Sequence, residues 1–214
     1  MVKKMSHLRM AIFMYAAVAL VPDTVMQRIE EGEIVSSTQV DELVDDKRRL
    51  SVTSVGLVKQ NKKKILALFD HPKALQSLSK QIQKVESLYS KKQNKIFLIQ
   101  ACFFLCAFKI KTAVDLHIGP QQKDQHVIAW QFLGSDVLAK KTSHTKWEKY
   151  DLHFVGMKGS TILKDYENDQ TLVGLESSWN TESSAFFRWM QKWMLKKALN
   201  QTIYEIRSNL ESNL

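Results

Sequence analysis

The alternation of apolar and polar positions is strongest between Phe108 and Ile118. Every second residue there is apolar or Thr, and the residues between are mostly charged or polar, which is the period of a strand with one wet face. The preceding segment, Ile96–Leu105, is apolar on both sides. It is a buried strand or a core helix, and its aromatic and β-branched residues favour the strand.

Further strands are predicted where short apolar runs lie between turn residues. Gly119-Pro120, Gly134-Ser135 and Asn168-Asp169 are such turns. The expected strands are Val52–Val58, Lys64–Phe69, His126–Leu133, Trp147–Val155, Thr161–Tyr166 and Thr171–Glu176. Their hairpin-like spacing predicts a mostly antiparallel sheet.

Helical spacing of apolar residues predicts two long helices. One covers residues 73–90, with a stripe of Leu75, Leu78, Ile82, Val85 and Tyr89. The other begins near Thr181 and ends near Asn209. Its stripe is Leu195, Leu199, Ile203, Ile206 and Leu210, extended toward the N-terminus by Phe187, Met190 and Met194.

Two shorter helices are expected in the N-terminal part of the chain. Asp23 suits the N-cap of a helix over Thr24–Glu31, which Gly32 ends. The S-S-T-Q pattern from Ser36 resembles a capping box and predicts a second helix over residues 37–49. The sequence thus predicts an α+β fold: N-terminal helices, then a mostly antiparallel sheet packed by a helix near 73–90 and a long C-terminal helix. We divide the chain into a helical region, 1–50, and an α+β domain, 51–214.

The first residues allow two interpretations. Met10–Val21 is an apolar run after Lys3, Lys4 and Arg9, and it has the length of a signal peptide or an anchor within residues 8–21. The other interpretation is a buried N-terminal helix that Pro22 ends. We expect a cytoplasmic protein, with membrane association or export through residues 8–21 as the alternative. The apolar run Ile96–Phe108 is shorter than the roughly 20 residues that a spanning helix needs.

Cys102 and Cys106 are the two cysteines of the chain. A disulfide between positions i and i+4 has poor geometry on a helix or a strand. A metal site would need more ligands than these two thiols. We therefore expect both cysteines to be reduced core residues, and we predict no metal and no cofactor.

Enzyme motifs are absent from the sequence. It contains no G-x-x-x-x-G-K-[ST], G-x-G-x-x-G, G-x-S-x-G or H-E-x-x-H pattern. The segment from Gly156 to Thr161 resembles a phosphate loop but lacks its spacing, so a hairpin turn is favoured. Asp115, His117 and His126 lie near one predicted turn and could hold a metal, but surface residues of these types are far commoner than ligands. The sequence leans against an enzyme without deciding the question.

Positive charge is concentrated in one segment. The net charge is +9, and residues 51–111 hold twelve lysines, no arginine and two acidic residues. We predict a non-enzymatic accessory protein whose lysine-rich surface binds an acidic protein partner or an anionic membrane surface. A sequence-tolerant nucleic-acid-binding protein is the alternative, because lysine without arginine gives diffuse attraction to phosphate and no base reading.

The predicted contact residues come from two parts of the chain. The basic ones are Lys59, Lys62, Lys63, Lys64, Lys80, Lys84, Lys91, Lys92, Arg188, Lys192 and Lys196. Trp189 and Trp193 flank the basic row on the C-terminal helix and are candidates for aromatic contact. We expect Trp193 to be a core residue, with membrane contact and base stacking as alternatives.

Overall fold

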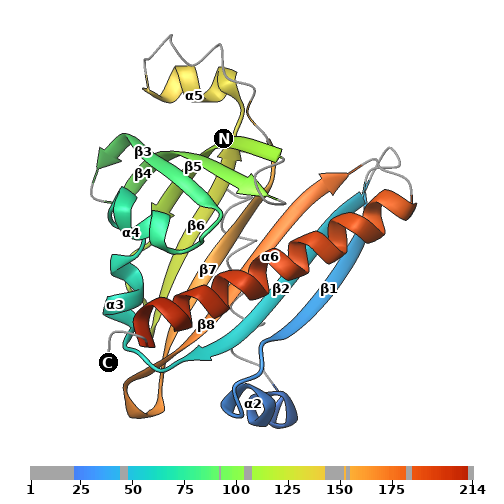
Figure 1. The fold of residues 1–214 in the computed structure, drawn as a ribbon. Coiled ribbons are helices and arrows are strands. Elements are labelled where there is room, and N and C mark those ends of the chain that lie inside the picture. Colours follow the sequence, from blue (N-terminus) through green and yellow to red (C-terminus); the bar gives the residue numbers. More distant parts are fainter. Residues whose placement is uncertain are drawn as a thin grey trace.

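The chain folds around one antiparallel sheet of eight strands (Figure 1). The structure is a computed structural model. It describes residues 22–43, 48–91, 93–103, 108–142, 152, 155–181 and 185–211. The strands follow the order β1-β2-β8-β7-β6-β5-β4-β3. The sheet is therefore a meander from β3 to β8 that continues through β2 to β1 at the other edge.

The strands are β1 (Val35–Glu42), β2 (Arg48–Val58), β3 (Ile82–Lys91), β4 (Asn94–Phe103), β5 (Phe108–Ile118), β6 (Gln125–Leu133), β7 (Lys158–Tyr166) and β8 (Gln170–Thr181). The helices are α2 (Asp23–Glu30), α3 (Lys62–Ala67), α4 (Pro72–Ser77), α5 (Ser135–Thr142) and α6 (Ala185–Glu211), and a 3-10 turn, η2, covers Glu167–Asp169.

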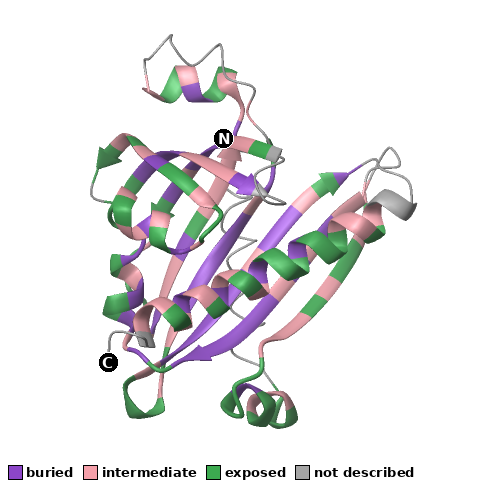
Figure 2. Ribbon diagram, in the orientation of Figure 1, coloured by how far each residue is buried: buried purple, intermediate pink, exposed green. Residues whose placement is uncertain are grey.

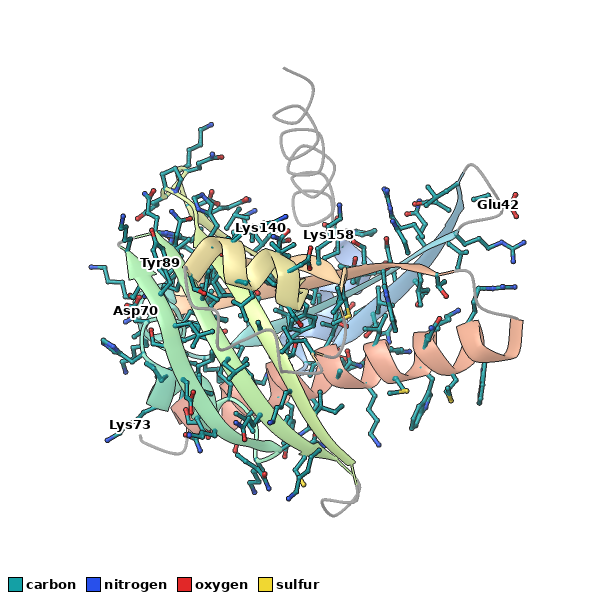
Figure 3. All side chains as sticks on the ribbon, turned by 90° about the horizontal axis from the view of Figure 1, so that it is seen from above. Glu42, Asp70, Lys73, Tyr89, Lys140 and Lys158 are labelled. Carbon is teal, nitrogen blue, oxygen red and sulfur yellow. The ribbon has the colours of Figure 1, made fainter. Side chains whose placement is uncertain are left out.

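The sheet bends around α6, as Figures 1 and 3 show. We call the face toward α6 the inner face. The main core lies there, between inner residues such as Val52, Leu163 and Val173 and the α6 residues Leu199 and Ile203. Figure 2 shows buried residues concentrated on the strands that α6 crosses.

The outer face is covered in two places. Ile29 of α2 packs with Val55 and Ile162, and Leu138 of α5 packs with Ala113 and Leu133. Alternate residues of β2, β5, β6 and β7 therefore point to different hydrophobic clusters, as the period of a strand requires.

Two buried lysines hold the α3–α4 segment against the sheet. Lys62 Nζ donates to Asp165 Oδ2 at 2.7 Å and to the Asp124 carbonyl at 2.9 Å. Lys95 Nζ on β4 donates to Asp70 Oδ1 at 2.5 Å and to the Asp70 carbonyl at 3.2 Å. The prediction of a strand over Lys64–Phe69 is wrong, because the Asn61 side chain caps α3 by accepting from the Lys64 N–H.

The predicted helix over residues 73–90 is also wrong. Only its beginning is helical: α4 starts at Pro72, which suits a first turn, and ends at Ser77. The rest is β3, whose backbone pairs with β4. The backbone N–H and C=O groups of β4 need hydrogen-bond partners, and β3 supplies them as a strand. This need outweighs the helical spacing of the apolar residues in the same segment.

The helix predicted over residues 37–49 is wrong: residues 37–42 belong to β1 and residues 48–49 to β2, so within the described residues only the first of the two predicted N-terminal helices, α2, is present. Ser36 does not cap a helix: its Oγ lies 3.1 Å from Ser54 Oγ on β2 and donates to Asn200 Oδ1 on α6 at 2.7 Å. β1 pairs with β2 along its whole length, and β2 begins at Arg48, so the sheet runs across residue 50.

Most of the predicted sheet is confirmed. The strands predicted at 52–58, 108–118, 126–133, 161–166 and 171–176 lie within β2, β5, β6, β7 and β8, and 96–103 lies in β4. The C-terminal helix is α6. Most of the predicted strand Trp147–Val155 lies outside the described residues, as do residues 8–21. No helix of the described ranges has the length and apolar character to cross a membrane.

Cys102 is buried, as predicted, but it is disulfide-bonded and not reduced. Cys106 lies outside the described residues.

Candidate functional site

Two polar side chains, those of Asn200 and Arg207, fix the rotation of α6 about its axis. Asn200 accepts from Ser36 on β1. Arg207 donates from Nε to the Leu57 carbonyl at 2.6 Å and from Nη1 to the Gly32 carbonyl at 2.7 Å. Asn200 and Arg207 therefore lie on the side of α6 nearest β1. The stripe that includes Leu199 faces the sheet.

The opposite side of α6 faces the strands beyond β8. Helical spacing places Gln191, Met194 and Ala198 on this side, at intervals of three and four residues. Met194 is 43% exposed and Ala198 is exposed. The side chains on this side of α6 are thus poorly covered by protein atoms.

Large aromatic side chains on the inner face are also incompletely covered. Trp130 and Phe132 on β6 and Trp179 on β8 pack against the core cluster but are only partly buried. The Trp130 and Phe132 ring centroids are 5.6 Å apart, with planes tilted by 45°. We call Trp130, Phe132 and Trp179 the inner-face aromatic group.

Gly159 on β7 allows Trp130 to lie against the sheet. It pairs with Trp130 on one side and with Ser177 on the other. A Cβ atom at Gly159 would lie 2.4 Å from Trp130 Cζ2 and 1.9 Å from the Glu176 carbonyl oxygen. Only glycine leaves room for the indole ring at this position.

A buried hydroxyl lies beside this group. Ser177 is fully buried, and its Oγ has no hydrogen-bond partner in the structure. Ser54 is equally buried on the inner face of β2, but its Oγ contacts Ser36 Oγ. The unpaired hydroxyl costs stability, because its hydration is lost without a replacement hydrogen bond.

Glu176 is an ionisable residue close to the inner-face aromatic group, but it lies on the other face of the sheet. Glu176 precedes Ser177 on β8, so its side chain points outward. Burial raises the pKa of the Glu176 carboxyl above its usual range.

Together these residues define what we call the inner-face site: Trp130, Phe132 and Trp179 from the sheet, and Met194 and Ala198 from α6. All five side chains are uncharged and predominantly apolar, and all remain accessible. Such a surface is suited to contact with an apolar molecule, because each apolar area removed from water contributes favourable free energy.

The predicted basic surface is only partly formed. Lys62 was predicted to belong to this surface, which is wrong, because its side chain is only 7% exposed and forms an ion pair with Asp165. Lys84 forms an ion pair with Glu86, and Lys91 Nζ lies 5.6 Å from the Tyr89 ring centroid. The exposed members are Lys59, Lys63, Lys64, Lys80, Lys84 and Lys91. Lys92 lies outside the described residues.

The other predicted contact residues lie on α6, far in sequence from the lysines between residues 59 and 92. Lys192 and Lys196 are exposed and Arg188 is partly buried. Trp189 is exposed. Trp193 is 51% exposed, so its predicted place in the core is wrong, and Lys197 Nζ lies 5.0 Å from its ring centroid. A contact role for Trp189 and Trp193 stays a prediction.

The possible metal ligands do not form a site. Asp115 pairs with Lys141, and His117 Nδ1 lies 2.7 Å from Asn94 Oδ1. His126 lies on β6 with a buried, unpaired Nδ1. Within the ranges that the structure describes, no three His, Cys, Asp or Glu residues are grouped as metal ligands would be.

The inner-face site was not predicted from the sequence, although the patterns of its separate elements already contain part of it. Alternation along His126–Leu133 places Trp130 and Phe132 on one face, and the predicted stripe of the C-terminal helix included Met194. Their meeting depends on the order of strands and on the rotation of α6, which the local pattern does not give.

No protein-family model matches the sequence, and no curated protein matches it. The fold, however, resembles solved structures. A STAR-related lipid transfer protein from Xanthomonas axonopodis (fragment 25–204) has a TM-score of 0.57 at 9% identity, over 81% of this chain and 98% of that one. The lipid transfer and protein localization domain of human StarD13 (DLC2) has a TM-score of 0.57 at 7% identity, over 88% and 97%.

An enzyme shares the architecture as well. The Zhui aromatase/cyclase from Streptomyces sp. R1128 has a TM-score of 0.55 at 11% identity, over 76% of this chain and 94% of the enzyme. At these identities the likeness establishes the fold, and the chain has the α+β fold of STAR-related lipid transfer domains.

These likenesses contradict the function predicted from charge. Among the proteins that share the fold are two lipid transfer domains. The prediction of an acidic protein partner or an anionic membrane surface, with nucleic acid as the alternative, is therefore wrong. The error came from treating the lysine excess as a site, whereas Lys62 and Lys95 are buried in ion pairs.

Proposed function

We propose that this protein binds an apolar small molecule, such as a lipid, at the inner-face site. The observation that carries the proposal is the accessibility of large apolar side chains on two elements that face each other. The aromatic group is partly exposed on the sheet, and Met194 is 43% exposed on the side of α6 toward β7.

Burial of these side chains by a ligand supplies the driving force. Each square ångström of apolar surface removed from water contributes about 25 cal/mol. Three aromatic side chains also offer flat surfaces to rings or acyl chains without losing many rotamers. The lipid transfer domains that share the fold support a lipid as the ligand class.

The test is a titration of the full chain with a pyrene-labelled fatty alcohol, followed by energy transfer from tryptophan to pyrene. The probe is uncharged, so binding measures apolar contact and not attraction to lysines. We expect saturable binding that changes little between low and high salt, since charge screening affects only electrostatic terms.

Met194→Glu and Trp193→Glu form a matched pair for this titration. The two residues are adjacent and similarly exposed, at 43% and 51%, so neither change should unfold the protein. Met194→Glu places a charge in the site and should weaken binding at least tenfold, or by about 1.4 kcal/mol. Trp193→Glu should keep the dissociation constant of the wild type, although its total energy transfer is lower because one of the five tryptophans is gone. Absence of saturable binding, or equal losses in both variants, would refute the proposal.

A further inference from the structure

The sheet has two edge strands, and they differ in character. β1 and β3 are the outer strands. Figure 3 labels Glu42 on β1 and Tyr89 on β3, at opposite sides of the molecule. Within the described parts of the chain, no segment pairs with the outer side of either strand. Such an edge presents unpaired N–H and C=O groups that can accept another strand.

β3 carries features that oppose pairing. Its register with β4 is interrupted between Ile82 and Lys84 and again between Ser87 and Tyr89. Lys84 and Lys91 add charge along it. Irregular register and lysines are the usual means by which an edge strand avoids association.

β1 has none of these features. Its eight residues pair with β2 in unbroken register, from Val35 opposite Val55 to Glu42 opposite Arg48. The strand, VSSTQVDE, contains no Pro, Gly, Lys or Arg. Val40 is 50% exposed, and Ser37 and Gln39 are also exposed. A regular and exposed edge of this length, whose only charged residues lie at its C-terminal end, is suited to strand pairing.

The two acidic residues of β1 lie at one end and face cations of their own sheet. Asp41 pairs in register with Arg49 and Glu42 with Arg48. Arg48 Nη2 lies 3.5 Å from Glu42 Oε1. Their negative charge is therefore partly balanced within the same chain, which reduces repulsion of a second acidic strand.

We propose that β1 pairs antiparallel with β1 of a second copy of this chain, so that the two sheets join across a twofold axis. The axis is perpendicular to the sheet, so residues that face each other must lie on the same face. With Thr38 on the axis, Ser37 of one copy faces Gln39 of the other, and Ser36 faces Val40.

This pairing keeps the acidic residues of the two copies apart. Asp41 of one copy then faces Val35 of the other, and the acidic ends of the two strands lie at opposite ends of the joint. No carboxylates meet, which is why a second copy fits this edge. The site for the apolar ligand is on the inner face, so the dimer leaves it open.

The test is sedimentation velocity of the full chain over a concentration series. The proposal expects a species of twice 24.7 kDa that dissociates on dilution. In the variant Ser37→Lys with Gln39→Lys, lysines of the two copies face each other, and the dimer dissociation constant should rise at least tenfold. A control variant, Ser87→Lys with Ser90→Lys, adds the same charge at exposed positions of β3 and should dimerise as wild type.

Three results would overturn the proposal: a monomeric wild type, a β1 variant that dimerises normally, or equal loss in the β3 control. A second measurement uses single cysteine variants at Ser37, Thr38 and Gln39. The residue on the twofold axis lies opposite the same residue of the second copy. Their Cα atoms are then within the distance of about 7 Å that a disulfide allows. Mild oxidation should link one variant as a covalent dimer and leave the wild type unlinked, and failure of all three to link would count equally against the joint.

Discussion

Lys62 and Lys63 are adjacent lysines that should respond very differently to replacement by alanine. The Lys62 side chain is 7% exposed and reaches across α3 to β7 and the turn before β6. Lys63 is exposed. The pair therefore isolates the effect of burial from the effect of removing one positive charge.

The magnitude for Lys62→Ala follows from its contacts. Its ammonium donates to Asp165 Oδ2 at 2.7 Å and to the Asp124 carbonyl at 2.9 Å. Hydrogen bonds to charged groups contribute about 1.5–3 kcal/mol each. Asp165 is 53% exposed, so water can solvate its carboxylate once the lysine is gone, and the loss stays below the 3–5 kcal/mol typical of a broken buried pair. We expect Lys62→Ala to lower the free energy of unfolding by about 2–3 kcal/mol.

Urea denaturation followed by circular dichroism measures both variants. Lys63→Ala should change the free energy of unfolding by less than about 0.5 kcal/mol. Equal effects of the two substitutions, or a Lys62→Ala variant as stable as wild type, would show that Lys62 is solvated and that α3 is not held as described.

Three further predictions concern the sheet beside the ligand site. Gly159→Ala should destabilise the protein by about 1–3 kcal/mol in urea denaturation, because the new Cβ meets the Glu176 carbonyl and the Trp130 ring; unchanged stability would contradict this close approach. Ser177→Ala should be neutral or stabilising, whereas Ser54→Ala should cost about 1 kcal/mol, because only Ser54 loses a hydrogen bond; equal losses would mean that Ser177 has a partner. Glu176→Gln should raise stability at pH 7, where the buried carboxyl is ionised at a cost, and the gain should fade as acid protonates Glu176 in the folded and then the unfolded chain; a pH-independent difference between variant and wild type would exclude this cause.

The alternating strands could be predicted because the inner face carries the main core, whereas the outer face is covered only in places. Phe108–Ile118 shows this: Val114 and Leu116 pack on the inner core, and Lys109 and His117 are exposed. The C-terminal helix was predictable for the same reason, since Leu195, Leu199, Ile203 and Ile206 keep helical spacing and are buried.

The region from 73 to 90 could not be predicted from its own pattern. Leu75 is a buried residue of α4 and Leu78 is a buried residue of the turn that follows it. Val85, in contrast, is a buried residue of β3. Two different elements thus produced one apparently continuous helical stripe. The distinction lies in the pairing of β3 with β4, a contact that local periodicity does not contain.

Charge was the less informative part of the sequence. Nothing in the run Asn61-Lys62-Lys63-Lys64 distinguishes the lysine that is buried from those that are exposed. The difference depends on Asp124 and Asp165, which reach α3 only in the folded sheet. The inner-face site likewise combines β6, β8 and α6, which come together through the strand order.

Photo-crosslinking tests the proposed ligand site most directly. A fatty alcohol with a diazirine in its chain is bound to the full chain, irradiated, and the labelled peptides are identified by mass spectrometry. We expect labels on peptides that contain Trp130 and Phe132, Trp179, or Met194 and Ala198, and we expect unlabelled fatty alcohol to compete for them. Labels that fall instead on the outer face, for example around Val55 and Ile162, or labels that resist competition, would contradict a ligand site between α6 and the sheet.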